Sequence, residues 1–312
     1  MAQSHTRTGI CPGCQHTITV PAELEIFSCL YCGRRLTPSE LGMSADALSP
    51  VQWQSLRDML AQELPKAVCH EPDTLKYMTK SGYPSRMEAY LQQYQPLFAH
   101  IPLLFPTPDP EKTASLAREV VAHIDRICGE RTRGIKTKSA LLDEAKFTLC
   151  LLCIPAMRTV NHPACEALSQ AIAHAWSERY PRNSFRLTTR EDILAGFQPR
   201  KLCYITTAVC NQAGKPDNCR ELSAFRRFRD EYLAHQPGGM DWIDRYYDCA
   251  PGITQTIDLC CDPETVYPAL WRNWLLPCYE ALCAGDNARC QRLYTQMVLQ
   301  LPETLLSGRK IS

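Results

Sequence analysis

Residues 201–253 decide the fold class and read KLCYITTAVCNQAGKPDNCRELSAFRRFRDEYLAHQPGGMDWIDRYYDCAPGI. Apolar and small residues recur at helical spacing between turns that contain Gly and Pro. The stretch therefore predicts three short helices, with Pro251 as the end of the third. These helices are expected to run from Leu202 to Asn211, from Cys219 to His235, and from Met240 to Tyr247.

The polar residues of this stretch fall on defined helix faces. Cys203, Thr206, Thr207 and Cys210 stand at i, i+3, i+4 and i+7, which is a single stripe of small side chains. Such a stripe allows another helix to approach closely. In the second segment, Arg229 and Asp230 are expected on a different face from the apolar residues, and we expect them to form a polar network that ties the three helices together.

The same stretch resembles the bacterial module called the CFI-box domain, whose pattern is Cys-Phe-Ile-Ala-Thr-Ala, Leu-Arg-x-Phe-Arg-Asp, Tyr-Tyr, Pro. The resemblance covers residues 201–253 of the 312, and the family has no settled activity. It implies a structural unit with four positions of interest: Cys203, Thr207, Arg229 and Asp230. The matching residues are CYITTA from Cys203, FRRFRD from Phe225, Tyr246, Tyr247 and Pro251, and the departures are Tyr204, Thr206, Phe225 and Ala250.

Helical periodicity continues on both sides of this unit, so the body is expected to be all α. The segment Thr137 to Thr159 is almost entirely apolar between Leu149 and Met157, which is typical of a buried helix. Cys150 and Cys153 within it are expected to be core thiols. The connector Ile101 to Pro110 holds four prolines and is expected to be extended. The other helices are expected at Val51–Leu64, Ser85–His100, Asp109–Cys128, Asn161–Tyr180, Pro263–Ala284 and Asp286–Leu301, the last two hinged at Gly285.

Near the N-terminus, two C-x2-C pairs predict a zinc site. Cys11 and Cys14 are separated from Cys29 and Cys32 by 14 residues. Four thiolates complete the tetrahedral shell of one Zn²⁺ ion and leave no position for water or substrate, so the site is expected to be structural. Thr17 to Val20 alternates like a strand, with Glu25 to Ser28 as its expected partner. The segment resembles the short bacterial zinc ribbons that stand at the head of larger proteins.

The ribbon offers several residues for contact with a partner. Gln15, His16, Leu30 and Tyr31 are expected on the exposed knuckles, and Arg34 and Arg35 are the adjacent basic residues. Because only two basic residues stand together here, we favour a protein partner, with nucleic acid as the alternative.

Composition limits the remaining choices. The net charge is +1, from 34 Lys and Arg against 33 Asp and Glu, which argues against a broad face for nucleic acid or membrane. The first ten residues are polar, and the longest uncharged apolar run has 11 residues, so a cytoplasmic protein without a membrane span is expected. Most of the 18 cysteines should then be reduced and buried. The expected organisation is a ribbon (1–36), a linker (37–50), a helical domain (51–200) and a helical region (201–312), the last two packed as one body.

Two interpretations of the function remain open. In the first, the chain is a non-enzymatic scaffold that binds another protein, and Cys203 contributes to packing. In the second, it is a cysteine-dependent hydrolase or peptide-processing enzyme, in which Lys201 and the helix N-terminus activate Cys203 as a nucleophile. The pattern places no histidine as its base, although His162, His174 and His235 are present. The burial and the neighbours of Cys203 discriminate between the two.

Overall fold

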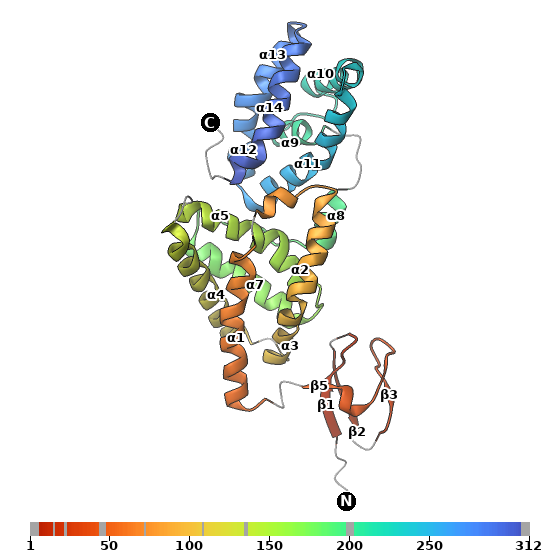
Figure 1. Ribbon diagram of the computed structural model, residues 1–312, viewed down its shortest axis with the longest axis vertical. Helices are drawn as coiled ribbons and strands as arrows, with labels where there is room; N and C mark the ends of the chain where they lie inside the picture. Colours follow the sequence, from red (N-terminus) through yellow and green to blue (C-terminus); the bar gives the residue numbers. More distant parts are fainter. Residues whose placement is uncertain are drawn as a thin grey trace, which may run out of the picture.

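The computed structural model describes residues 6–14, 16–21, 24–43, 48–71, 73–107, 109–133, 137–197 and 203–306. The described chain is mainly helical, with small antiparallel hairpins near the N-terminus, so the predicted fold class is confirmed. Figure 1 shows three parts along the long axis: a ribbon of β-strands, a middle layer built from α1 to α8, and an end layer built from α9 to α14.

The ribbon contains two separate antiparallel pairings. Strand β1 (Thr6–Ile10) lies between β2 (Thr17–Pro21) and β5 (Gly42–Met43), and β3 (Phe27–Ser28) pairs with β4 (Arg35–Leu36). The predicted pairing of Thr17–Val20 with Glu25–Ser28 is therefore wrong. Each C-x2-C pair instead lies in the turn of its own hairpin. Strand β2 pairs with β1 across the first cysteine turn, and β3 pairs with β4 across the second.

A small core of its own holds the ribbon together. Ile18, Val20, Leu36 and Leu41 are buried around two of the cysteines. Because Leu41 belongs to this core and β5 belongs to the sheet, the ribbon continues past residue 36 into the segment that was expected to be a linker. A 3-10 turn at Pro38–Glu40 joins β4 to β5.

Helix α4 is central to the middle part and packs against both α1 and α7. Side chains of Ser49, Asp109, Thr137 and Thr189 accept backbone N–H groups at the starts of α1, α4, α5 and α8, as expected for N-caps. The helices are α1 (Pro50–Cys69), α2 (Gly82–Phe98), α3 (His100–Leu104), α4 (Pro110–Glu130), α5 (Lys138–Thr148), α6 (Ile154–Arg158), α7 (Pro163–Arg179) and α8 (Arg190–Gly196), with 3-10 turns at Thr74–Tyr77 and Arg131–Arg133.

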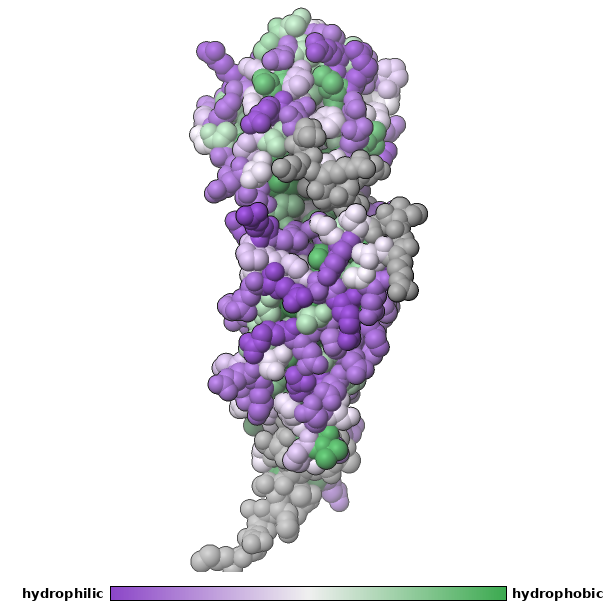
Figure 2. All heavy atoms as spheres, turned by 90° about the vertical axis from the view of Figure 1, so that its left-hand side faces the viewer, coloured by the Kyte–Doolittle hydropathy of each residue, from purple (hydrophilic) through white to green (hydrophobic). Residues whose placement is uncertain are grey.

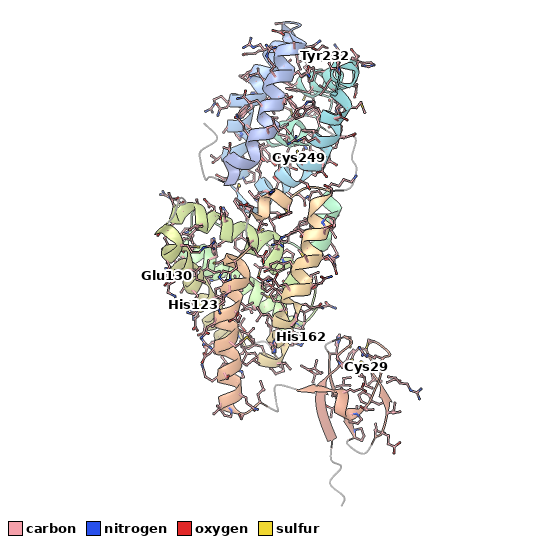
Figure 3. The ribbon with its side chains drawn as sticks, viewed as in Figure 1. Cys29, His123, Glu130, His162, Tyr232 and Cys249 are labelled. Atoms are coloured by element: carbon pink, nitrogen blue, oxygen red, sulfur yellow. The ribbon has the colours of Figure 1, made fainter. Side chains whose placement is uncertain are left out.

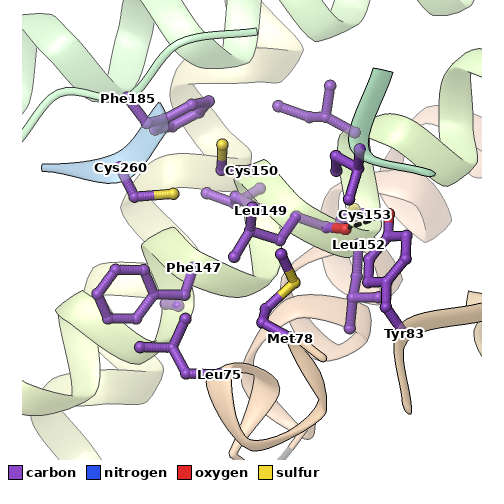
Figure 4. Close-up of a cluster of buried hydrophobic side chains, with 14 of the residues drawn as sticks. Leu75, Met78, Tyr83, Phe147, Leu149, Cys150, Leu152, Cys153, Phe185 and Cys260 are labelled. Atoms are coloured by element: carbon purple, nitrogen blue, oxygen red, sulfur yellow. Dashed lines mark hydrogen bonds between the residues drawn. The ribbon is translucent and has the colours of Figure 1, made fainter. Parts of the chain in front are cut away.

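Two sequence expectations concern this part. The connector Ile101 to Pro110 is helical over α3, because Ile101 and Leu104 are buried in the core, so the prediction of an extended segment is wrong there. The apolar helix is buried as expected, and a π-helical turn, Leu149–Cys153, joins α5 to α6. Figure 4 shows Cys150 and Cys153 among apolar side chains, with Cys260 near Cys150.

The end part begins at Cys203, since residues 198–202 lie outside the described residues. Its helices are α9 (Tyr204–Gln212), α10 (Arg220–Arg227), α11 (Gly239–Cys260), α12 (Pro263–Leu270), α13 (Leu276–Cys283) and α14 (Asn287–Leu306). π-helical turns at Phe228–Tyr232 and Trp271–Leu275 and a 3-10 turn at Leu233–His235 extend α10 and join α12 to α13. Gly285 has a φ of 76° between α13 and α14, in agreement with the predicted hinge.

Helix α11 does not end before Pro251 and instead continues to Cys260, so that prediction is wrong. Its second half, from Ala250 onward, is largely buried, and this tertiary packing outweighs the missing N–H of the proline. The helix also contacts the middle part directly. The Asp248 carboxylate accepts the backbone N–H of Ser81 at 2.8 Å and its hydroxyl at 3.1 Å, and Arg186 N donates to Leu259 O at 2.8 Å. One helix thus joins the two helical parts.

The outer face of the helical body is polar. Figure 2 shows that hydrophilic residues cover most of this side, with hydrophobic residues scattered among them. Among the described residues, no helix combines the length and the apolar character that crossing a bilayer requires.

Candidate functional site

The four cysteines of the ribbon form one cluster. The Sγ atoms of Cys11, Cys14, Cys29 and Cys32 all lie within 4.8 Å of one another. The closest approaches cross between the two pairs: Cys11 Sγ lies 3.7 Å from Cys32 Sγ, and Cys14 Sγ lies 3.5 Å from Cys29 Sγ. Four sulfurs at the corners of a tetrahedron, each about 2.3 Å from a central metal, stand about 3.8 Å apart. The cluster therefore has the geometry of a tetrahedral metal site.

Backbone hydrogen bonds position these thiols. In the first turn, Cys11 N donates to His16 O at 3.0 Å and Gly13 N donates to Cys11 Sγ at 3.4 Å. In the second turn, Cys29 N donates to Arg34 O and Gly33 N donates to Cys29 O, both at 2.8 Å. Gly33 has a φ of 72°, a conformation that glycine adopts without strain. In the folded ribbon the two turns therefore hold their sulfurs facing one another.

The cysteines of the cluster differ in pKa. Burial raises the pKa of Cys29, but hydrogen bonds from the backbone N–H groups of Cys32 and Tyr31 outweigh this effect. The resulting pKa is about 6. Burial and the neighbouring thiols raise the pKa of Cys14 to about 12. Cys29 is thus prepared as a thiolate, the form that binds metals.

Next to the cluster, an aromatic and an aliphatic side chain face solvent. Leu30 is 89% exposed and Tyr31 is 62% exposed. The His16 ring stacks on Tyr31 with a centroid distance of 4.2 Å, and its Nδ1 lies 3.1 Å from Cys14 O. His16 therefore supports the knuckle and is not part of the metal cluster. Gln15, also expected on the knuckle, lies outside the described residues.

The second candidate site surrounds Cys203, the N-cap residue of α9. Its side chain is 4% exposed and faces an apolar pocket of about 40 Å³, room for roughly one water molecule. Arg229 Nη1 lies 3.7 Å from Cys203 Sγ. Burial raises the pKa of Cys203, although Arg229 and Arg226 act in the opposite direction. The sulfur is therefore a protonated thiol at neutral pH.

Arg229 contacts residues of all three helical segments. Besides Cys203, it binds Tyr247 Oη of α11 at 2.6 Å and both carboxylate oxygens of Asp230, at 2.6 and 2.8 Å. Asp230, however, has a side chain that is 60% exposed, so it neutralises the arginine from the solvent side. Thr207 is buried, and its hydroxyl has no hydrogen-bond partner among the described residues.

The histidines considered as bases are placed elsewhere, and His235 is exposed at the end of the 3-10 turn Leu233–His235. Figure 3 shows His162 in the middle part, on the side that faces the ribbon, and its Nδ1 accepts Ala164 N at 3.1 Å. His174 lies on α7, 3.5 Å from Glu178. The charged groups named as shifting the pKa of Cys203 are Arg229, Arg226 and Asp230, and none of them is a histidine. Lys201, expected to activate the thiol, lies outside the described residues.

The state of Cys203 can be tested by alkylation. We expect iodoacetamide at pH 7.5 to modify Cys203 at least about tenfold more slowly than the exposed Cys283, because only an accessible thiolate reacts quickly. Peptide mapping by mass spectrometry over time gives both rates in one sample. Rapid modification of Cys203 ahead of Cys283 would instead support a nucleophile.

Sequence reasoning missed two features of these sites. Tyr246 Oη accepts the N–H of Ile205 at 3.0 Å and so caps the start of α9 from a distant helix. Buried cysteines also meet in pairs, among them Cys69 with Cys128 and Cys278 with Cys290. No local spacing signals either feature, because the partners come from different helices.

Comparison of the chain with protein-family models, curated proteins and solved structures finds no match.

Proposed function

We propose that this chain is a zinc-dependent adaptor: a four-cysteine zinc ribbon that binds another protein, carried by a helical scaffold. A closed set of four thiolates at tetrahedral spacing suits Zn²⁺, and it leaves no coordination position for a substrate. The metal then serves to fold the ribbon, whose own apolar core is small.

The observation that carries this proposal is the exposed knuckle, Leu30 and Tyr31, beside the cluster. Both side chains lie on a turn that the metal would make rigid, and they remain in solvent. Aromatic residues on rigid supports are enriched in protein interfaces, because they bury much area at little entropic cost. Ile26, 54% exposed in the same ribbon, adds apolar surface.

Nucleic acid fits this knuckle less well. Over residues 1–43, three arginines (Arg7, Arg34 and Arg35) are balanced by three glutamates. A ribbon that binds phosphates needs an excess of positive charge, which supplies most of the affinity. A protein partner is therefore favoured.

The enzyme interpretation is also less well supported. Cys203 is a buried thiol with a raised pKa, and its pocket has room for little more than a water molecule. Its sulfur packs beneath the bridge that Arg229 makes to Tyr247. We propose that residues 201–253 are a CFI-box-like unit whose Cys203, Thr207, Arg229 and Asp230 maintain helix packing. Free thiols throughout the chain are consistent with a reducing compartment, and we propose a cytoplasmic protein.

The knuckle can be tested by a double variant, Leu30→Ser with Tyr31→Ser. We expect it to lower the affinity for the partner at least about tenfold, since central interface residues contribute about 2 kcal/mol or more. Partners are enriched on the immobilised wild-type chain after nuclease treatment, identified by mass spectrometry, and measured again as purified proteins by calorimetry.

Val51→Ser is a matched control, because Val51 is 78% exposed and apolar but lies on α1 outside the ribbon. It should leave binding unchanged, and both variants should retain the metal. Equal recovery of every partner by all three chains would contradict the proposal. Loss of the partners on nuclease treatment, with binding of oligonucleotides by the pure chain, would favour the nucleic-acid alternative.

A further inference from the structure

Two cysteines that are far apart in sequence meet where α1 and α4 end. Cys69 is the last residue of α1, and Cys128 lies in the last turn of α4. Both cysteines line one pocket, and each thiol is the largest influence on the pKa of the other. A hydrogen bond fixes the same place: Arg131, just after α4, donates from Nη1 to the backbone carbonyl of Cys69. The Arg131 hydrogen bond thus joins the two helix ends beside the cysteine pair.

This junction opens into a polar pocket of about 280 Å³. A water molecule occupies about 30 Å³, so the space admits a small polar reagent. Cys69 and Cys128, 8% and 3% exposed, form part of its wall together with Arg131. The rest of the polar lining is His70, Glu71, Asp73 and Glu144.

We propose that Cys69 and Cys128 are a thiol oxidation site, at which a hydroperoxide converts the pair into a reversible disulfide bond. The site would link the end of α1 covalently to the end of α4. It is independent of the zinc ribbon and of Cys203, and it requires neither of them.

The surroundings assign a different role to each sulfur. The neighbouring Cys69 thiol and the positive charges of Arg131 and Lys138 lower the pKa of Cys128, against the opposing effects of burial and Asp125. The pKa of Cys69 is raised, first by the Cys128 thiol and then by burial. Because the pKa of Cys128 is lowered while that of Cys69 is raised, we assign the attacking role to Cys128 and the resolving role to Cys69.

The chemistry balances in two steps. The Cys128 thiolate attacks one oxygen of hydrogen peroxide, the O–O bond breaks, and the departing hydroxide takes up a proton as water, which leaves a sulfenic acid. The Cys69 sulfur then attacks the Cys128 sulfur, the S–O bond breaks, and the hydroxyl leaves as water with the proton of Cys69. Two thiols are oxidised, and one peroxide is reduced to two waters.

The chain also contains a matched internal control. Cys278 is the largest influence on the pKa of Cys290, and both are completely buried. The pKa of Cys290 is raised by Cys278 and by burial, with no cation acting against them. This second pair has the proximity of the first without its arginine, and the comparison between them needs no mutation.

The experiment treats the full-length wild-type chain with hydrogen peroxide, blocks the remaining thiols with N-ethylmaleimide, and maps tryptic peptides by mass spectrometry. Cleavage after Lys66, Lys76, Arg126 and Arg131 places the two cysteines in peptides 67–76 and 127–131. We expect these peptides to become linked at least about tenfold faster than those that hold Cys278 and Cys290, and to separate on addition of dithiothreitol.

Variants assign the roles of the two sulfurs. Cys69→Ser should leave a sulfenic acid at Cys128 that dimedone labels, whereas Cys128→Ser should leave Cys69 unlabelled. Arg131→Gln should slow the linkage several-fold without preventing it. The proposal is overturned if the wild-type chain links Cys278 with Cys290 as fast as Cys69 with Cys128, or if no Cys69–Cys128 link forms.

Discussion

Replacing Cys11 with serine should remove the metal from the chain. The wild-type protein is expected to carry one zinc ion per chain, and the Cys11→Ser variant none, because Cys11 Sγ is one of four sulfurs within 4.8 Å of one another. Structural zinc sites contribute apparent binding free energies on the order of 10 kcal/mol, so a ribbon with so small a core should unfold without the ion. Metal analysis of the purified chains by plasma mass spectrometry measures the first effect.

The helical body should survive this change. The ribbon and the body have separate cores, so far-ultraviolet circular dichroism should retain its helical signal while protease cuts within residues 1–43. Cys283→Ser is the matched control, because Cys283 is exposed and lies outside the cluster, and it should keep the metal. A wild-type chain without metal, or one that holds iron instead, would contradict the zinc assignment.

The local chemistry of the ribbon could be predicted from sequence, but its strand pairing could not. The spacing of Cys11, Cys14, Cys29 and Cys32 alone brings the four thiols to one point, and the structure places them there. The partner of β2, however, is β1, a strand that lies before the first cysteine. A two-residue spacing fixes a metal-binding turn but does not specify which strand enters it.

In the helical body, periodicity predicted where helices lie but not how they meet. The stripe of Cys203, Thr206, Thr207 and Cys210 is buried, as its spacing indicated. The continuation of α11 past Pro251 and the pairing of Cys69 with Cys128 were missed. Both depend on contacts between residues that are distant in sequence, and single-sequence patterns carry only local information. Tertiary packing can hold a proline within a helix when the surrounding surface is buried.

The junction between the two helical parts depends on a glycine that follows this proline. A Cβ atom added at Gly252 of α11 would lie 1.7 Å from Met78 O and 2.6 Å from its carbonyl carbon. Backbone atoms cannot move aside as the end of a flexible side chain can. Gly252→Ala must therefore push α11 away from the segment after Thr74–Tyr77, and it should also weaken the neighbouring contact of Lys80 N with Asp248 O, now 2.8 Å long.

We expect Gly252→Ala to lower the free energy of unfolding by at least about 3 kcal/mol, the upper range for overpacked interiors. This is opposite in sign to the usual effect, since Ala is favoured over Gly by up to about 1 kcal/mol inside a helix. Gly129→Ala supplies that comparison, because a Cβ on Gly129 of α4 would meet only the end of Lys138, at 3.8 Å and beyond. Denaturation in guanidinium chloride, followed by circular dichroism, should shift the two variants in opposite directions. Equal midpoints for Gly252→Ala and the wild type would show that α11 does not approach Met78 so closely.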